Sequence, residues 1–153
     1  MALIFFIVPQ LIVRFLNQEP KVDSNIIYLI FAACLPLIWI FLPRELASVR
    51  QVNFLQHMIG GGVAVAFVSI YFIKSLRENY PIFKNPIFQL FFVYALVSML
   101  GVANEILEFM LDRLKVGIFS TDRYDTWFDL TANTVGAISL YFIYFIGSNI
   151  SKK

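Results

Sequence analysis

The chain has 153 residues, of which 59% are hydrophobic, 17% aromatic and only 14% charged. A soluble domain carries about 25% charged residues, so this composition indicates a membrane protein. The single cysteine excludes a disulfide scaffold, and the single histidine excludes a poly-histidine metal centre. The net charge of +2 is too small to indicate nucleic-acid binding, and 17 Phe side chains exclude intrinsic disorder.

Five hydrophobic segments follow one another along the chain, and we expect each to be helical. The first, residues 3–16, is short and contains Pro9, so we interpret it as a thin, kinked span, with an interfacial helix as the alternative. The others are nearly free of charge and long enough to cross a hydrocarbon core of about 30 Å. These four clear spans are predicted at 25–43, 56–76, 86–111 and 128–150. The predicted fold is all-α, a polytopic transmembrane helical bundle forming one domain over residues 1–153.

Span parity assigns each charged linker to one of two membrane faces. Side A holds linkers 44–50 and 112–129, and side B holds linkers 17–23 and 74–84 together with the C-terminus. Side B has seven Lys and Arg residues against five on side A, which predicts a cytoplasmic side B and a cytoplasmic C-terminus. Seven of the ten acidic residues lie towards side A. Acidic residues do little to set topology, so this excess indicates a functional site on side A.

The polar residues near side A share helix faces that point into the predicted bundle. Glu105, Glu108 and Asp112 follow i, i+3, i+7 spacing on one face of the fourth span. Asp129 and Asn133 are one turn apart at the start of the fifth span. His57 opens the third span and precedes three consecutive glycines. Ionisable residues inside a membrane are expensive, so we expect them to form a site.

We assign roles by side-chain chemistry. The candidate catalytic residues are His57, Glu105, Glu108 and Asp125, and the candidate metal ligands are Glu105, Glu108, Asp125 and Asp129. The candidate substrate-binding residues are Asn104, Arg123 and Asn133. Carboxylates with one imidazole suit Mg²⁺, Mn²⁺ or Zn²⁺, and they also suit an acid–base pair. Arg123 could hold a phosphate in a bidentate clamp.

The alternative is that these groups are structural. Glu105 and Glu108 would then form ion pairs with Arg113 or Arg123, and His57 would be an interfacial polar residue. Asp122 and Asp125 would cap the last helix.

The pattern from His57 to Tyr141 resembles the VanZ-like and YjdF-like families of small integral membrane proteins. The residues that carry the resemblance are His57, Asn104-Glu105, Glu108, Arg123-x-Asp125-x-x-x-Asp129 and Asn133-Thr134-Val135-Gly136-Ala137. The resemblance implies four or five membrane helices and a link to glycopeptide-antibiotic resistance, without a settled biochemical activity. It also implies shared polar positions at His57, Glu105, Glu108, Asp125, Asp129 and Asn133. Gln56 departs from the charged residue expected before the histidine.

The leading hypothesis is an integral membrane protein that binds or processes a lipid or lipid-phosphate headgroup at side A. A phosphate would require a divalent metal there, because the acidic residues alone would repel it. The expected partners are membrane lipids and not nucleic acid, and a homo- or hetero-oligomer is compatible with the sequence. The alternative is a non-enzymatic module, either a small transporter with Glu105 and Glu108 as a proton relay or an assembly partner. Whether the protein is an enzyme stays open.

Overall fold

The computed structural model describes residues 2–17, 25–41, 50–115 and 124–150, and within these ranges all the regular elements are helical. The prediction of an all-α fold is therefore confirmed for the described residues. The elements, in chain order, are α1 (Ala2–Asn17), α2 (Ile26–Cys34), η1 (Leu35–Phe41), α4 (Arg50–Gln56), η2 (His57–Val63), α5 (Ala64–Leu76), η3 (Pro81–Lys84), α6 (Pro86–Arg113) and α7 (Asp125–Ile150).

Among the described residues, three helices are long and apolar enough to cross a membrane. They are Arg50–Leu76, in which α4, η2 and α5 run on as one helix, Pro86–Arg113 and Asp125–Ile150. Two further apolar helical stretches, Phe6–Asn17 and Ile26–Ile38, are shorter. Of the five expected segments, three thus meet the criterion of length and composition, and the other two are helical but short.

The short second segment has a local cause. Its α-helix ends at Cys34, and a 3₁₀-helix continues from Leu35 to Phe41. Pro36 stands at the change of helix type. Its ring removes a backbone donor and crowds the carbonyl one turn earlier, which disfavours regular α-helix at this point. Pro9 lies inside α1, yet α1 is one helix from Ala2 to Asn17.

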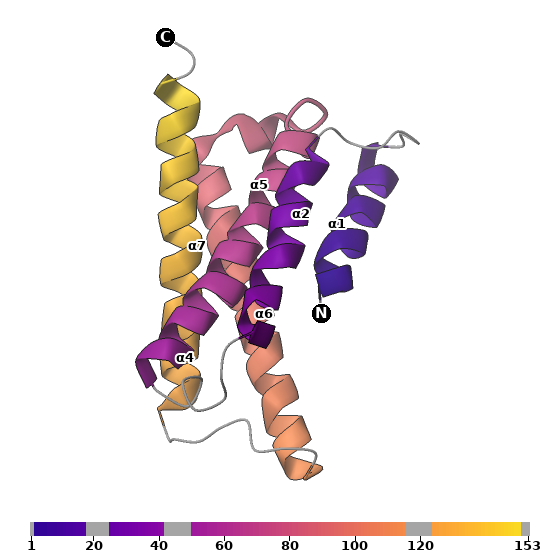
Figure 1. The fold of residues 1–153 in the computed structure, drawn as a ribbon. Coiled ribbons are helices and arrows are strands. Elements are labelled where there is room, and N and C mark those ends of the chain that lie inside the picture. Colours follow the sequence, from indigo (N-terminus) through magenta and orange to yellow (C-terminus); the bar gives the residue numbers. More distant parts are fainter. Residues whose placement is uncertain (1, 18–24, 42–49, 116–123, 151–153) are drawn as a thin grey trace.

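The helix Arg50–Leu76 is the centre of the molecule. Its apolar stretch is 61% buried, against 17% for Pro86–Arg113 and 28% for Asp125–Ile150. In Figure 1, α5 runs between α2 on one side and α7 on the other, with α6 behind it. The core around α5 includes Tyr71, Ile70 and Ile73, each nearly inaccessible to solvent. The two outer long helices therefore leave wide apolar faces, as expected for helices that meet lipid.

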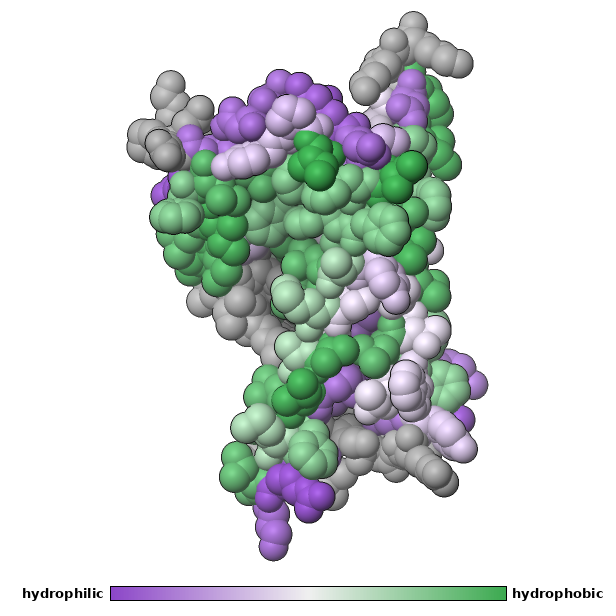
Figure 2. Space-filling model, turned by 180° about the vertical axis from the view of Figure 1, so that it is seen from behind, coloured by the Kyte–Doolittle hydropathy of each residue, from purple (hydrophilic) through white to green (hydrophobic). Residues whose placement is uncertain are grey.

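The chain runs back and forth along the long axis of the molecule. The start of α4, the end of α6 and the start of α7 lie at one end of Figure 1, and the end of α7 lies at the other with η3. The face seen in Figure 2 has a broad hydrophobic band with hydrophilic residues towards both ends. The same alternation brings the glutamate-bearing end of α6 to the aspartate-bearing start of α7.

Two helix boundaries differ from the sequence prediction in a way that matters for the site. The central helix begins at Arg50 rather than at 56, and α7 begins at Asp125 rather than at 128. Each extension begins with a charged residue, Arg50 or Asp125, which is why hydrophobicity alone places the start of each span later. In the folded protein these two polar turns pack against each other, because Asn53 of α4 bonds to Asp125 and Asp129 of α7.

Candidate functional site

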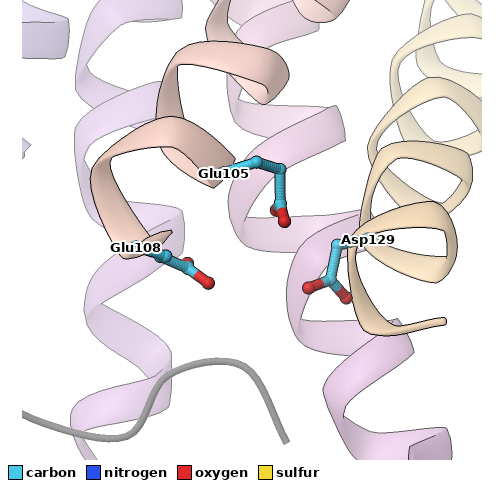
Figure 3. Close-up of side chains that lie close together, drawn as sticks. All are labelled: Glu105, Glu108 and Asp129. Atoms are coloured by element: carbon cyan, nitrogen blue, oxygen red, sulfur yellow. The ribbon is translucent and has the colours of Figure 1, made fainter. Parts of the chain in front are cut away.

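Three carboxylates converge between α6 and α7. Glu105 and Glu108 are three residues apart on α6, and Asp129 lies in the second turn of α7. One carboxylate oxygen from each residue lies within 4.8 Å of the others. Figure 3 shows the three side chains pointing towards one another across the gap between the helices. We call these residues the carboxylate cluster.

Asp129 is the most buried member of the cluster, with 2% of its surface exposed. Its Oδ2 lies 3.3 Å from Nε2 of His57, and its Oδ1 accepts a hydrogen bond from Nδ2 of Asn53 at 3.2 Å. The same amide of Asn53 lies 3.4 Å from Oδ1 of Asp125. Asp129 is therefore held by two residues of the central helix, one turn apart, at i and i+4.

The two glutamates have fewer partners. Nδ2 of Asn104 donates to Oε1 of Glu108 at 2.7 Å, and the Thr126 side chain hydrogen-bonds to Glu105. Oε1 of Glu105 is buried and has no hydrogen-bond partner within the described ranges of the chain. Two unit negative charges 4.8 Å apart repel by about 3 kcal/mol at an effective dielectric constant of about 20. Neutral donors offset only part of this repulsion, so the cluster favours a cation or protons.

Within the described part of the chain, Lys and Arg side chains do not neutralise the carboxylate cluster through ion pairs. His57 is the only basic residue there that forms an ion pair with the cluster. Arg113, which the structural alternative pairs with the glutamates, stacks over the Phe109 ring at 5.1 Å. Arg123, the other suggested partner, and Asp122 lie outside the described residues.

Glycines allow the helices to come close enough to form the cluster. η2 is π-helical and contains Gly60, Gly61 and Gly62. A Cβ on Gly61 would collide with the Asn133 side chain, and one on Gly62 would collide with the Asn133 backbone carbonyl. From the opposite side, a Cβ on Gly136 would collide with the backbone carbonyl of Met58. Small residues are what permit such backbone approach in membrane helices, and π-helical turns occur frequently at functional sites.

A pocket of about 440 Å³ adjoins the cluster. Its polar lining includes His57, Asn104, Glu108 and Asn133. Most of the remaining wall is apolar and comes from η1, α5 and α6. A volume of this size is within the range of small-molecule sites.

The structure brings together some of the predicted site residues and separates others. His57, Glu105, Glu108 and Asp129 meet at the cluster. Asp125 was assigned both catalytic and metal-ligating roles, but it is connected to the cluster through Asn53 and does not belong to the group of close carboxylate oxygens. The two amides, Asn104 and Asn133, line the pocket.

Asn53 is a site residue that the sequence analysis did not identify. It lies four residues before His57, on the same helix face, but it falls before the predicted start of the span at 56. Its helical spacing to His57 is the signal that could have identified it.

Glu105, Glu108 and Asp129 are placed so that together they could hold a hard cation. Mg²⁺, Mn²⁺ and Ca²⁺ take oxygen ligands at about 2.0–2.6 Å, so ligands on opposite sides of an ion are about 4–5 Å apart. Carboxylate oxygens within 4.8 Å of one another match this spacing. The unpartnered Oε1 of Glu105 provides a free acceptor atom. The imidazole of His57, already paired with Asp129, could orient that ligand or exchange a proton with it.

Comparison with known proteins gives the family of the chain. Residues 2–149 match the family model described as Predicted membrane protein (DUF2238). Neither a curated protein nor a solved structure matches the chain. The family match supports a membrane protein, as the composition predicted, but it does not extend to the VanZ-like or YjdF-like families. Covering nearly the whole chain, it establishes that this protein belongs to the DUF2238 family of predicted membrane proteins.

Proposed function

We propose that this protein binds a divalent cation at the carboxylate cluster and uses it to hold a lipid or lipid-phosphate headgroup. The observation that carries the proposal is the approach of three carboxylate oxygens to within 4.8 Å of one another. Within the described residues, neither Lys nor Arg forms an ion pair with this cluster. Three acids brought together at the end of membrane helices cost free energy unless a cation or protons neutralise them.

The ligands would be Glu105, Glu108 and Asp129, with His57 holding Asp129 in place. The cation would supply Lewis-acid and electrostatic stabilisation for an anionic headgroup, which the carboxylates alone would repel. Arg123 and Asp125 stay proposed contributors, the first to phosphate binding and the second to metal binding or proton transfer. If the protein is an enzyme, metal-assisted hydrolysis or transfer on such a lipid is the reaction class that this chemistry supports.

The proposed arrangement in the membrane has five embedded segments. The α2–η1 segment combines nine α-helical and seven 3₁₀ residues, a length of about 27 Å that approaches the thickness of the hydrocarbon core. We place the C-terminus in the cytoplasm and the cluster at the opposite face, from the excess of Lys and Arg on side B. The relationship to VanZ-like and YjdF-like proteins belongs to this proposal and rests on the polar motif alone.

The test is Mn²⁺ binding to the purified protein in lipid nanodiscs, measured from the free Mn²⁺ signal by electron paramagnetic resonance. Glu105→Gln and Glu108→Gln should each weaken Mn²⁺ binding at least about tenfold, as expected when a charged ligand becomes neutral. Asp112→Asn is the matched control, because Asp112 is on the same helix but outside the carboxylate cluster.

Two results would contradict the metal site. One is wild-type protein that binds no Mn²⁺ and gains no thermal stability from Mg²⁺, Mn²⁺ or Zn²⁺, since a ligand that binds only the folded state must raise its stability. The other is equal Mn²⁺ affinity in Glu105→Gln and in the control. Either result would leave the non-enzymatic alternative, in which Glu105 and Glu108 relay protons or the protein serves as an assembly partner.

A further inference from the structure

The pocket beside the carboxylate cluster has two chemically different parts. The side chains of Val65, Val97, Leu100 and Leu107 give it an apolar wall. Its polar lining includes three neutral amides, from Gln56, Asn104 and Asn133. An apolar cavity with a few polar groups at one place is the usual form of a site for an amphiphilic small molecule.

Asn133 supplies an independent observation that favours a polar ligand there. The residue is 5% exposed, and its buried Oδ1 has no hydrogen-bond partner among the residues that the structure describes. Its amide lies between Gly61 and Gly101, and both glycines line the pocket. A buried amide atom without a partner costs about 1–3 kcal/mol, so natural proteins seldom leave one unless a water or ligand pairs with it. Rotation of the amide about χ2 lets it present either its oxygen or its nitrogen.

Charge selects among the possible headgroups. Three ionised carboxylates with one divalent cation carry a net charge of −1, so an anion would be held only where it contacts the cation directly, and the neutral amides of the pocket would not attract one. An alkylammonium would compete with the cation for the same carboxylates. A hydroxyl has no charge, donates to an amide oxygen and accepts from an amide N–H, which are the groups that Asn104 and Asn133 contain.

We propose that this pocket binds an uncharged lipid alcohol, with its hydroxyl at the Asn133 amide and its apolar chain along Val65, Val97 and Leu100. The proposal rests on the proposed headgroup function and narrows the ligand class to a long-chain alcohol. Glu108 of the carboxylate cluster lines the same pocket as Asn133, so the alcohol and the cation would occupy neighbouring parts of one site. The chain then follows α6, whose wide apolar face is exposed.

The experiment uses the full-length protein in phosphatidylcholine vesicles with a photoactivatable long-chain alcohol that carries a diazirine in its chain. Crosslinked peptides are mapped by mass spectrometry, with and without competing decanol. We expect labelling within residues 57–65 and 97–108, and decanol should compete at least fivefold better than decyl methyl ether, which keeps the chain but lacks the hydroxyl donor. Decyl phosphate and decylamine should compete less well than decanol.

Three variants keep the result interpretable. Ala103 is an exposed residue of the pocket lining, so Ala103→Trp should obstruct the pocket and abolish the competed labelling, whereas Val102→Trp, also exposed but outside the lining, should not. Asn133→Leu should keep the labelling but lose the preference for decanol over the ether. Should Asn133→Leu fail to fold, the Ala103→Trp and Val102→Trp pair still decides the matter.

Several outcomes overturn the proposal. Equal labelling of the lipid-facing stretch around Phe91 and Tyr94 would mean that the probe reports only on lipid. Labelling that Ala103→Trp leaves unchanged would exclude the pocket, and better competition by decyl phosphate or decylamine would exclude the alcohol. Mn²⁺ binding measured on the same vesicles separates the two proposals, because loss of the pocket with intact Mn²⁺ binding leaves the cation site standing.

Discussion

At the scale of single residues, Asp129 is the point on which the site depends. It is the most buried acid of the cluster, and both of its oxygens are engaged by the central helix, through Asn53 and His57. A buried carboxylate with two neutral or weakly basic partners keeps much of its charge uncompensated. Asn53 matters most for the position of Asp129, because its one amide nitrogen donates to both Asp125 and Asp129.

The first prediction concerns Asn53→Ala. Removing the amide leaves Asp129 with one partner, so stability should fall by about 1 kcal/mol and Mn²⁺ affinity by about 10-fold, as for other residues that orient metal ligands. Thermal unfolding and Mn²⁺ titration of the purified variant measure the two effects. Gln51→Ala, an exposed change two residues earlier, should stay within about 0.5 kcal/mol of the wild type. Unchanged Mn²⁺ affinity in Asn53→Ala would show that the amide does not position a ligand.

At the scale of elements, close contact between η2 and α7 decides the geometry. Gly61 and Gly62 face Asn133, and Gly136 faces the backbone of Met58. Each glycine faces the partner helix across a gap too small for a methyl group. The two helices can therefore bring Asp129 and His57 within 3.3 Å. The contact is as much a part of the site as its polar side chains.

The second prediction compares two glycines of the same helix. Gly136→Ala forces a Cβ against the Met58 carbonyl and should destabilise the protein by about 1–3 kcal/mol, as overpacking does. Gly147→Ala meets no atom within 4 Å and should stabilise α7 by about 0.5–1 kcal/mol, because alanine is the better helix former. Melting temperatures in one detergent measure both changes. A lower melting temperature for Gly147→Ala than for Gly136→Ala would contradict the close contact.

At the scale of the whole molecule, the two ends of the helix bundle carry different groups. The end with η3 carries Arg77, Glu78 and Lys84 in a mutual charge network, whereas the other end carries the carboxylate cluster. In Figure 1 these two regions lie at opposite ends of the long helices. The two ends therefore meet different compartments if the long helices cross the bilayer.

The third prediction tests this orientation by cysteine labelling. With the single natural cysteine removed by Cys34→Ser, we introduce Asn79→Cys at the η3 end or Tyr124→Cys at the cluster end, both exposed positions. A membrane-impermeant maleimide added to intact expressing cells should label Tyr124→Cys and spare Asn79→Cys, if side B is cytoplasmic as we propose from its excess of Lys and Arg. The reverse pattern would invert the orientation, and labelling of both would mean that the ends do not lie on opposite sides.

The sequence by itself determined the class of the protein. Apolar runs that are long enough for a bilayer and nearly free of charge dictate helices, because the backbone must satisfy its hydrogen bonds within each segment. The same reasoning identified the helix of Glu105 and Glu108 and the helix of Asp129, since both are long and clearly bounded. Asn85 and Pro86 even mark the start of α6, where the Asn85 side chain accepts from the Ile87 and Phe88 amides.

The tertiary structure alone decided which polar groups meet. Hydropathy placed the start of the central helix too late to include Asn53, because the burial of this amide is compensated only by its partners on α7. Helical spacing places Asp125 and Asp129 one turn apart on the same face, yet only Asp129 lies close to both glutamates. That choice depends on helix separation, which small residues at Gly61, Gly62 and Gly136 set. Periodicity reports which face a residue occupies, whereas distance between faces is a property of packing.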